Sequence, residues 1–157
     1  MLWGVAVLSQ CFSASVLRCF GATVERSNAK ESMNKVGSFL ELEVYKSAFE
    51  LQQAIFEISK KWPRNEDYSL TDQIRRSSRS IGANLAEAWA KRRYPAHFLS
   101  KLTDSDGELQ EALHWLLTAY RCGYLSEPQF SDFQERLAAV GRQLGTMINR
   151  YQSFCFS

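Results

Sequence analysis

The sequence contains few residues of the kinds that interrupt a folded core. It has three prolines and eight glycines in 157 residues, while 45% of its residues are hydrophobic and 23% are charged. This composition excludes a disordered, collagen-like or low-complexity chain. A length of 157 residues suits one domain with a hydrophobic core. No segment has the apolar and polar alternation of a strand, so we expect an all-α fold.

Cysteine is scarce and lacks metal-ligand spacing. Neither Cys-x-x-Cys nor a Cys/His cluster occurs, which predicts free thiols in a cytoplasmic protein. The four cysteines are Cys11, Cys19, Cys122 and Cys155.

Histidine is rarer than cysteine, with two residues in the chain. Glu111 and His114 form one Glu-x-x-His unit of the kind that di-iron bundles use, but such a site needs two units and two further glutamates. His97 has Tyr94 three positions before it, so the second unit is missing. We therefore predict no metal and no cofactor. The chain also lacks a nucleophile–base pairing and a glycine-rich phosphate loop, so we expect no enzyme.

The N-terminal segment differs from the rest of the chain. Residues 1–32 lack a basic start, and polar residues interrupt the apolar stretch within them. This apolar stretch is too short and too polar to span a bilayer. We favour translation from Met33, which would make the upstream residues a mis-assigned or disordered extension. A signal peptide is the alternative. We expect an extension over 1–38, a helical domain over 39–152 and a tail over 153–157, without a membrane partner.

From residue 39 onward, hydrophobic residues recur at helical spacing in four segments. Pro63 ends the first, Ser69 caps the second, Pro95 begins the third, and Gly123 closes it. Ser126-Glu-Pro-Gln129 has the spacing of a capping box for the fourth. The expected helices span residues 41–62, 70–94, 95–122 and 127–151. Four amphipathic helices with short loops predict an antiparallel, up-down-up-down four-helix bundle.

Each predicted helix has an apolar stripe for the core. In the third helix, Ser105 and Asp106 interrupt the stripe; we expect Ser105 inside and Asp106 outside. The first stripe comprises Tyr45, Ala48, Phe49, Ile55, Phe56 and Trp62, with Val44, Leu51 and Ile58 beside it. The second comprises Leu70, Ile74, Ser77, Ile81, Leu85, Ala88 and Trp89.

Small residues occupy the predicted flank and outer side of the second helix. They are Gly82, Ala83, Ala86 and Ala90. Small side chains let another helix come close, so we interpret this face as a contact with a neighbouring subunit. The alternative is that alanine is simply a good helix former.

Basic residues are concentrated in the same helix. Residues 75–93 contain six basic residues and one acidic residue, Glu87, which gives a local net charge of +5. Arginine and lysine supply most phosphate contacts, so the pattern predicts a nucleic-acid-binding surface. Alternatively, the cations interact with the helix dipole or pair with carboxylates across a subunit interface. The six residues are Arg75, Arg76, Arg79, Lys91, Arg92 and Arg93. No aromatic-interleaved RNA motif accompanies them.

Residues 73–87, QIRRSSRSIGANLAE, closely resemble the signature helix of the 23S rRNA intervening-sequence protein family, also called the four-helix bundle protein family. The resemblance extends over most of residues 39–151. It includes Leu-Glu-Val-Tyr-Lys46, Trp-Pro63, Tyr68-Ser-Leu, Glu108-Leu and Gly-Tyr-Leu125. The family pattern has glycine where this chain has Ala88, and a small Gly-Ser pair where it has Asp104-Ser105.

The resemblance implies a small cytoplasmic bacterial protein whose bundles assemble into a ring-like homopentamer. Some members are encoded within inserts of the large ribosomal RNA gene. A similar protein is the accessory variability protein of diversity-generating retroelements, a basic pentamer that implies RNA or DNA and a reverse transcriptase as partners. A purely structural or protein-interaction scaffold without nucleic-acid binding is the alternative function.

Overall fold

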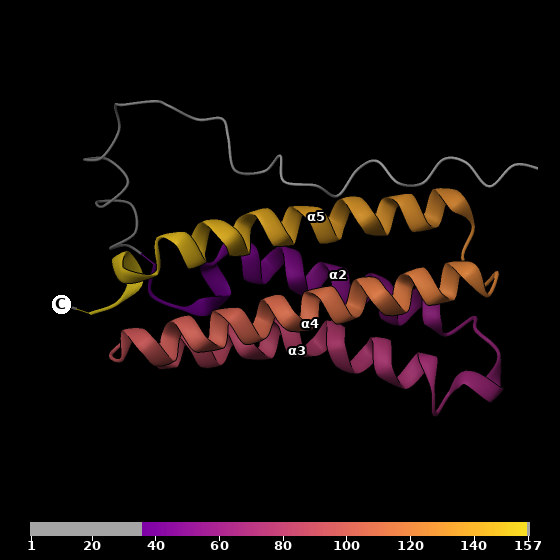
Figure 1. The fold of residues 1–157 in the computed structure, drawn as a ribbon, viewed down its shortest axis with the longest axis horizontal. Helices are drawn as coiled ribbons and strands as arrows, with labels where there is room; N and C mark the ends of the chain where they lie inside the picture. The colour runs from indigo at the N-terminus through magenta and orange to yellow at the C-terminus, as the bar shows by residue number, and fades with distance from the viewer. Residues whose placement is uncertain (1–35, 157) are drawn as a thin grey trace, which may run out of the picture.

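The computed structural model describes residues 36–156, in which four α-helices lie side by side along the long axis of a bundle (Figure 1). They are α2 (Glu43–Ser59), α3 (Leu70–Ala90), α4 (Pro95–Arg121) and α5 (Glu127–Asn149). Three 3₁₀-helices accompany them, at Phe39–Glu41, Arg64–Glu66 and Tyr151–Phe154. No strand occurs in the described range, which confirms the all-α class. The predictions for residues 1–35 lie outside that range.

Contacts between neighbouring helices close the bundle into one unit. α3 contacts α2 and α4, and α5 contacts α4 and α2. In Figure 1 the α2–α3 and α4–α5 connections lie at one end of the bundle and the α3–α4 connection at the other. This arrangement gives α3 two flanks: one faces α2 and the other faces α4.

Local sequence signals set several helix ends as predicted. The Ser126 hydroxyl accepts from the Gln129 N–H, and the Gln129 side chain accepts from the Ser126 N–H, which completes the capping box. Gly123 has φ +78°, a left-handed conformation that glycine adopts without a Cβ clash. Pro95 is the first residue of α4.

α2 and α3 end three and four residues earlier than predicted, each shortly before a proline: the last residue of α2 lies four positions before Pro63, and that of α3 lies five positions before Pro95. α2 ends at Ser59 instead of Trp62, and α3 ends at Ala90 instead of Tyr94. A proline cannot donate to the carbonyl four residues back, and its ring crowds that position. Ser69 lies at the N-cap position of α3, but its hydroxyl contacts Glu66 instead of capping the helix.

The core confirms the predicted stripe of α3 and corrects that of α2. All seven predicted residues of α3 are buried. In α2 the buried residues are Val44, Ala48, Leu51, Ile55 and Ser59. The predicted core residues Tyr45 and Phe56 are instead half-buried, and Phe49 is 45% exposed. α2 packs against both α3 and α5, so the residues that face the gap between these two helices are the buried ones. The aromatic residues lie beside this buried face, on the edge of α2 next to α3.

Candidate nucleic-acid interface

The six predicted phosphate-binding residues do not form one surface. Arg75, Arg76 and Arg79 lie in the first half of α3, whereas Lys91, Arg92 and Arg93 follow its last residue. Lys91 is twelve residues beyond Arg79, about 18 Å along the axis at 1.5 Å per residue. The structure therefore divides the predicted basic surface into two separate groups.

Arg75 and Arg79 face α2 and gather around Phe56. The Arg75 Nε donates to the Ser59 Oγ at 2.8 Å, and its Cζ lies 5.1 Å from the Phe56 ring centroid. The Arg79 Cζ lies 5.7 Å from the same centroid, and the Lys60 Nζ lies 4.4 Å from it. We call Phe56, Lys60, Arg75 and Arg79 the Phe56 cluster.

The Phe56 cluster carries positive charge that neighbouring carboxylates do not balance. Lys60 pairs with Glu57, with 2.7 Å between Nζ and Oε1. Within residues 36–156, no ion pair involves Arg75 or Arg79. Cations over an aromatic face are attracted to it and remain able to bind anions with their outer N–H groups. Within residues 36–156 the cluster thus presents two arginines without an ion pair, and the hydrogen bond to Ser59 holds Arg75 in place.

Arg76 points to the other flank of α3, toward α4. Its Nη1 lies 3.9 Å from the Asp72 Oδ2. Burial, followed by the negative charge of Glu111, raises the pKa of Glu108, and the positive charge of Arg76 acts in the opposite direction. Arg76 therefore lies near the carboxylates of Asp72 and Glu108, apart from Arg75 and Arg79.

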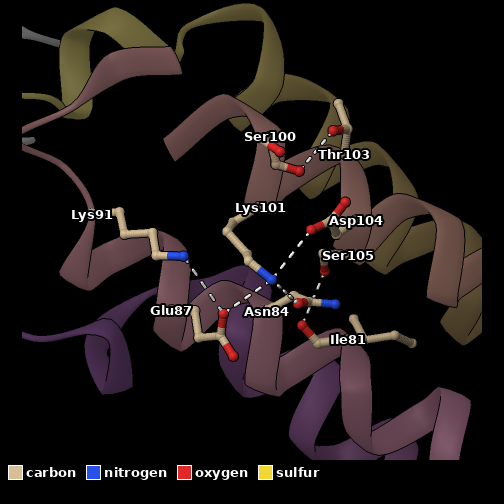
Figure 2. Close-up of polar contacts among 9 residues, drawn as sticks. All are labelled: Ile81, Asn84, Glu87, Lys91, Ser100, Lys101, Thr103, Asp104 and Ser105. Carbon is tan, nitrogen blue, oxygen red and sulfur yellow. Dashed lines mark hydrogen bonds and ion pairs between the residues drawn. The ribbon is translucent and has the colours of Figure 1, made fainter. Parts of the chain in front are cut away.

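A polar network ties α3 to α4 and includes Lys91 at its edge (Figure 2). The Lys101 Nζ lies 3.0 Å from the Glu87 Oε2 and 3.2 Å from the Asp104 Oδ2, and donates to the Asn84 Oδ1 at 3.3 Å. Hydrogen bonds to Glu87 and then Asp104 raise the pKa of Lys101. Lys91 lies 3.9 Å from the same Glu87 carboxylate. Its charge is therefore partly compensated within the chain.

The Ser105 hydroxyl links α4 to α3 beside this network. Its fully buried hydroxyl donates to the Ile81 carbonyl at 3.0 Å (Figure 2). The expectation that Ser105 lies inside is confirmed, while Asp106 is half-buried. The Asp104-Ser105 pair, where the family pattern has small residues, thus supplies one carboxylate and one hydroxyl to the α3–α4 contact.

Arg92 contacts aromatic rings and backbone groups within the chain. Its Cζ lies 3.4 Å from the Trp89 ring centroid and 4.7 Å from that of Phe156, and its Nε donates to the Trp89 carbonyl at 3.0 Å. The Phe156 N–H donates to the Arg92 carbonyl at 3.3 Å. Burial lowers the pKa of Arg92 and raises that of the Cys155 thiol. Arg92 therefore anchors the C-terminal segment, while Arg93 is exposed.

The predicted subunit-contact residues separate into two kinds. Gly82 is buried within the chain, and an ideal Cβ there would lie 3.5 Å from the Tyr45 ring. This corrects its expected outer position, because the missing side chain serves the α2–α3 contact. Ala83 and Ala90 are exposed and Ala86 is half-buried, so these three residues lie at the outer surface.

The remaining chemical candidates have ordinary surroundings. The Trp115 Nε1 donates to the Glu111 Oε1 at 3.0 Å, and exposed His114 packs edge-on against Trp115. Within the described range, no three His, Cys, Asp or Glu side chains gather as metal ligands. Cys122 and Cys155 are free thiols there. No helix in the part of the chain that the structure describes is long and apolar enough to cross a membrane.

A groove between α2 and α5 has a volume of about 330 Å³. Its lining combines two carboxylates and one ammonium group with an amide and apolar side chains, without a histidine, serine or cysteine. The lining residues are Ala54, Glu57, Ile58, Lys61, Gln129, Asp132 and Phe133. This set offers no nucleophile paired with a base.

Sequence reasoning missed the α2 half of the Phe56 cluster. The sequence pattern places Phe56 in the core and assigns no role to Ser59 or Lys60. The spacing of Phe56 and Lys60 does place them one turn apart on one helix face. Their approach to Arg75 and Arg79 depends on the packing of α2 against α3, which no local pattern contains.

Comparisons with known proteins agree with this architecture. Residues 40–146 match the family described as 23S rRNA-intervening sequence protein. A similar solved structure is a protein with unknown function from the S23 ribosomal protein family of Bacteroides thetaiotaomicron VPI-5482. It is 26% identical, the match covers 68% of this chain and 95% of that chain, and the TM-score is 0.62. Among curated proteins, none matches. The family match spans most of the four-helix bundle, and the chain therefore belongs to the 23S rRNA-intervening sequence protein family.

Proposed function

We propose that this chain is a non-enzymatic, cytoplasmic bacterial protein that binds RNA or DNA through the basic surface of α3. In this proposal, up-down-up-down bundles assemble into a ring-like homo-oligomer, a pentamer by family resemblance. The same resemblance supports a protein partner such as a reverse transcriptase. The Phe56 cluster gives this proposal its strongest support, because Arg75 and Arg79 have no ion pair within residues 36–156. Arg76 and Lys91 each lie 3.9 Å from a carboxylate, and Arg92 contacts Trp89. Arg93 is exposed and stays part of the proposed surface.

The observation that carries the proposal is that the guanidinium groups of Arg75 and Arg79, beside Lys60, have no ion pair within residues 36–156. Each group supplies charge-assisted donors of the kind that phosphate oxygens accept. One cluster contacts few phosphates and binds weakly alone. Repetition around an oligomer multiplies its effect through high effective concentration, which suits a chain with a net charge of only +2.

The experiment measures binding of the full chain to labelled structured RNA and duplex DNA at about 50 and 200 mM salt. The test variant replaces Lys60, Arg75 and Arg79 with glutamine. A matched control replaces three exposed cations elsewhere, Arg121, Arg142 and Arg150, with glutamine. We expect the test variant to bind at least about tenfold more weakly, and the slope of log affinity against log salt concentration to fall in magnitude by about two. The control should lose less affinity and keep nearly the wild-type slope.

Two outcomes would overturn the proposal. One is an absence of binding to either polymer at low salt by an oligomer of confirmed mass. The other is an equal loss in both triple variants, which would mean that net charge acts without a site. Circular dichroism of each variant checks that the helices persist.

A protein-interaction scaffold is the second candidate, and the exposed Phe49 favours it. Phe49 is 45% exposed, and its ring stacks on Tyr45 with centroids 6.2 Å apart. Aromatic residues and arginine are enriched at protein interfaces. In this function Arg75 and Arg79 contact carboxylates of a neighbouring subunit. The glutamine variant would then lower the molar mass in light scattering, and wild-type protein would not bind nucleic acid.

A further inference from the structure

The facing edges of α2 and α3 interleave aromatic rings with arginines. Phe56 lies on the edge of α2 that faces α3, and Arg75 and Arg79 lie on the edge of α3 that faces α2. Phe49 precedes Phe56 by two helical turns on the same edge, and its ring stacks on Tyr45, which lies against Gly82 of α3. Neither helix contains an aromatic-interleaved motif of its own. Antiparallel packing creates the pattern from two segments. We call Phe49 and the Phe56 cluster the α2–α3 seam.

The spacing of the seam matches a short stretch of an unpaired strand. Phe49 and Phe56 are seven residues apart, about 10 Å along α2. Stacked nucleotides advance by about 3.4 Å each, so the two rings are about three nucleotides apart. The cations of the Phe56 cluster lie within 5.7 Å of the Phe56 centroid, beside one end of that interval.

The Arg75 guanidinium is oriented before any ligand arrives. Its Nε donates to the Ser59 Oγ at 2.8 Å, and that hydroxyl donates to the Phe56 carbonyl at 3.1 Å. Ser59 is buried, so this chain of hydrogen bonds is shielded from water. The two Nη groups of Arg75 remain as donors, and a guanidinium held in place loses less entropy when it binds a phosphate.

We propose that the α2–α3 seam binds single-stranded nucleic acid in preference to duplex. This inference rests on the proposed function and names the form of its ligand. The phosphates contact Arg75, Arg79 and Lys60, which lie over the Phe56 ring, while a base stacks against the exposed Phe49 ring. Paired bases are stacked within their helix and cannot reach the Phe49 ring, whereas unpaired bases can.

The test uses fluorescence anisotropy with the full chain. The probes are a labelled oligonucleotide of about 12 nucleotides as single-stranded RNA, as single-stranded DNA, and as the matching duplexes; this length exceeds the roughly three-nucleotide interval and lies within typical site sizes. The ring variants are Phe49→Leu and Phe56→Leu, which keep apolar volume but remove the aromatic face. Tyr94→Leu is the matched control, because Tyr94 is 58% exposed and lies before α4, outside the seam.

We expect the single strands to bind at least about tenfold more tightly than the duplexes. Base–aromatic stacking is worth about 1–3 kcal/mol, so Phe49→Leu should weaken single-strand binding by about 5- to 150-fold with an unchanged salt slope. Phe56→Leu should weaken binding and also lower the salt slope, because the Phe56 ring positions the three cations. Arg79→Gln should instead lower the slope by about 0.7, the value for one phosphate contact on a single strand. Tyr94→Leu and Arg142→Gln should leave these values close to wild type.

The outcomes separate this inference from the proposed function. Equal affinity for single strands and duplexes, or ring variants that bind like wild type, would overturn the seam while nucleic-acid binding stands. Absence of binding to every probe would overturn both. A lower molar mass of Phe49→Leu with unchanged affinity per subunit would overturn the inference by assigning that ring to a subunit contact. Arg79→Gln retains the seam rings and gives an independent reading if a ring variant unfolds.

Discussion

Substitution of two buried serines should show which hydroxyl holds two helices together. Ser105 and Ser77 are both almost fully buried, and both lie in helices. The Ser105 hydroxyl donates to the Ile81 carbonyl on another helix at 3.0 Å. The Ser77 hydroxyl donates to the Gln73 carbonyl of its own helix at 3.1 Å. Alanine at each position removes the same atom from the same degree of burial, so the pair isolates the interhelical hydrogen bond.

The expected magnitudes follow from this difference. An intramolecular hydrogen bond contributes about 1 kcal/mol net, and alanine exceeds serine in helix propensity by about 0.5 kcal/mol. Ser105→Ala should therefore lower the free energy of unfolding by about 0.5–1 kcal/mol. At Ser77 the lost bond is local and competes with the helix, so Ser77→Ala should stay within about 0.5 kcal/mol of wild type.

Urea unfolding followed by circular dichroism measures both values. The Ser105→Ala midpoint should fall with an unchanged m-value, because the exposed surface on unfolding is the same. The Ser77→Ala midpoint should remain near that of wild type. Equal destabilisation by the two substitutions would refute the reasoning, since it would show that burial of the hydroxyl, and not its partner on another helix, decides the effect.

Three further predictions test other parts of the chain. Hydrogen bonds from Ser69 and then from Tyr124 lower the pKa of Glu66, so the stabilising effect of this carboxylate is present above its ordinary pKa and is lost as pH falls through the lowered value. Tyr124→Phe should raise the pKa of Glu66 in a carboxyl NMR titration. Gly123→Ala should lower the free energy of unfolding by about 1–2 kcal/mol, because Gly123 has φ +78°. Gly107 lies within α4, and an added Cβ would meet open space, so Gly107→Ala should raise the free energy of unfolding by about 1 kcal/mol; thermal melts measure both. Ala86→Glu should break the proposed oligomer in light scattering, because it would bury an unpaired charge at a subunit contact.

Each of these has a contrary result. An unaltered Glu66 titration in Tyr124→Phe would show that the phenol does not set that pKa. Changes of the same sign at both glycines would mean that backbone conformation is not the deciding difference. An oligomer of unchanged mass in Ala86→Glu would place the subunit contact elsewhere.

Local sequence was sufficient for the existence of the helices and for several of their ends. The capping box at Ser126, the proline that begins α4 and the glycine at residue 123 act through hydrogen bonds and backbone sterics within a few residues. The α3 stripe was also predictable, because its apolar residues define one face without a competitor. Such signals require no knowledge of a distant segment.

In α2 the same reasoning failed because two overlapping arcs are apolar. One contains Val44, Leu51 and Ile55, and the other contains Phe49 and Phe56. An arc about 100° wide suits the core, and periodicity does not choose between two neighbouring arcs of similar character. Packing against α3 and α5 together selected the first and left the aromatic rings beside α3.

The sequence by itself determined where helices form and that positive charge accumulates between residues 75 and 93, because both depend on short-range order. Only the tertiary structure decided which of those charges are free. In the folded chain Arg92 contacts Trp89 and Phe156, whereas Arg75 and Arg79 contact Phe56 on another helix. The physical reason is that a side chain's partner is set by the flank of the neighbouring helix that it meets, and this depends on contacts between residues far apart in sequence.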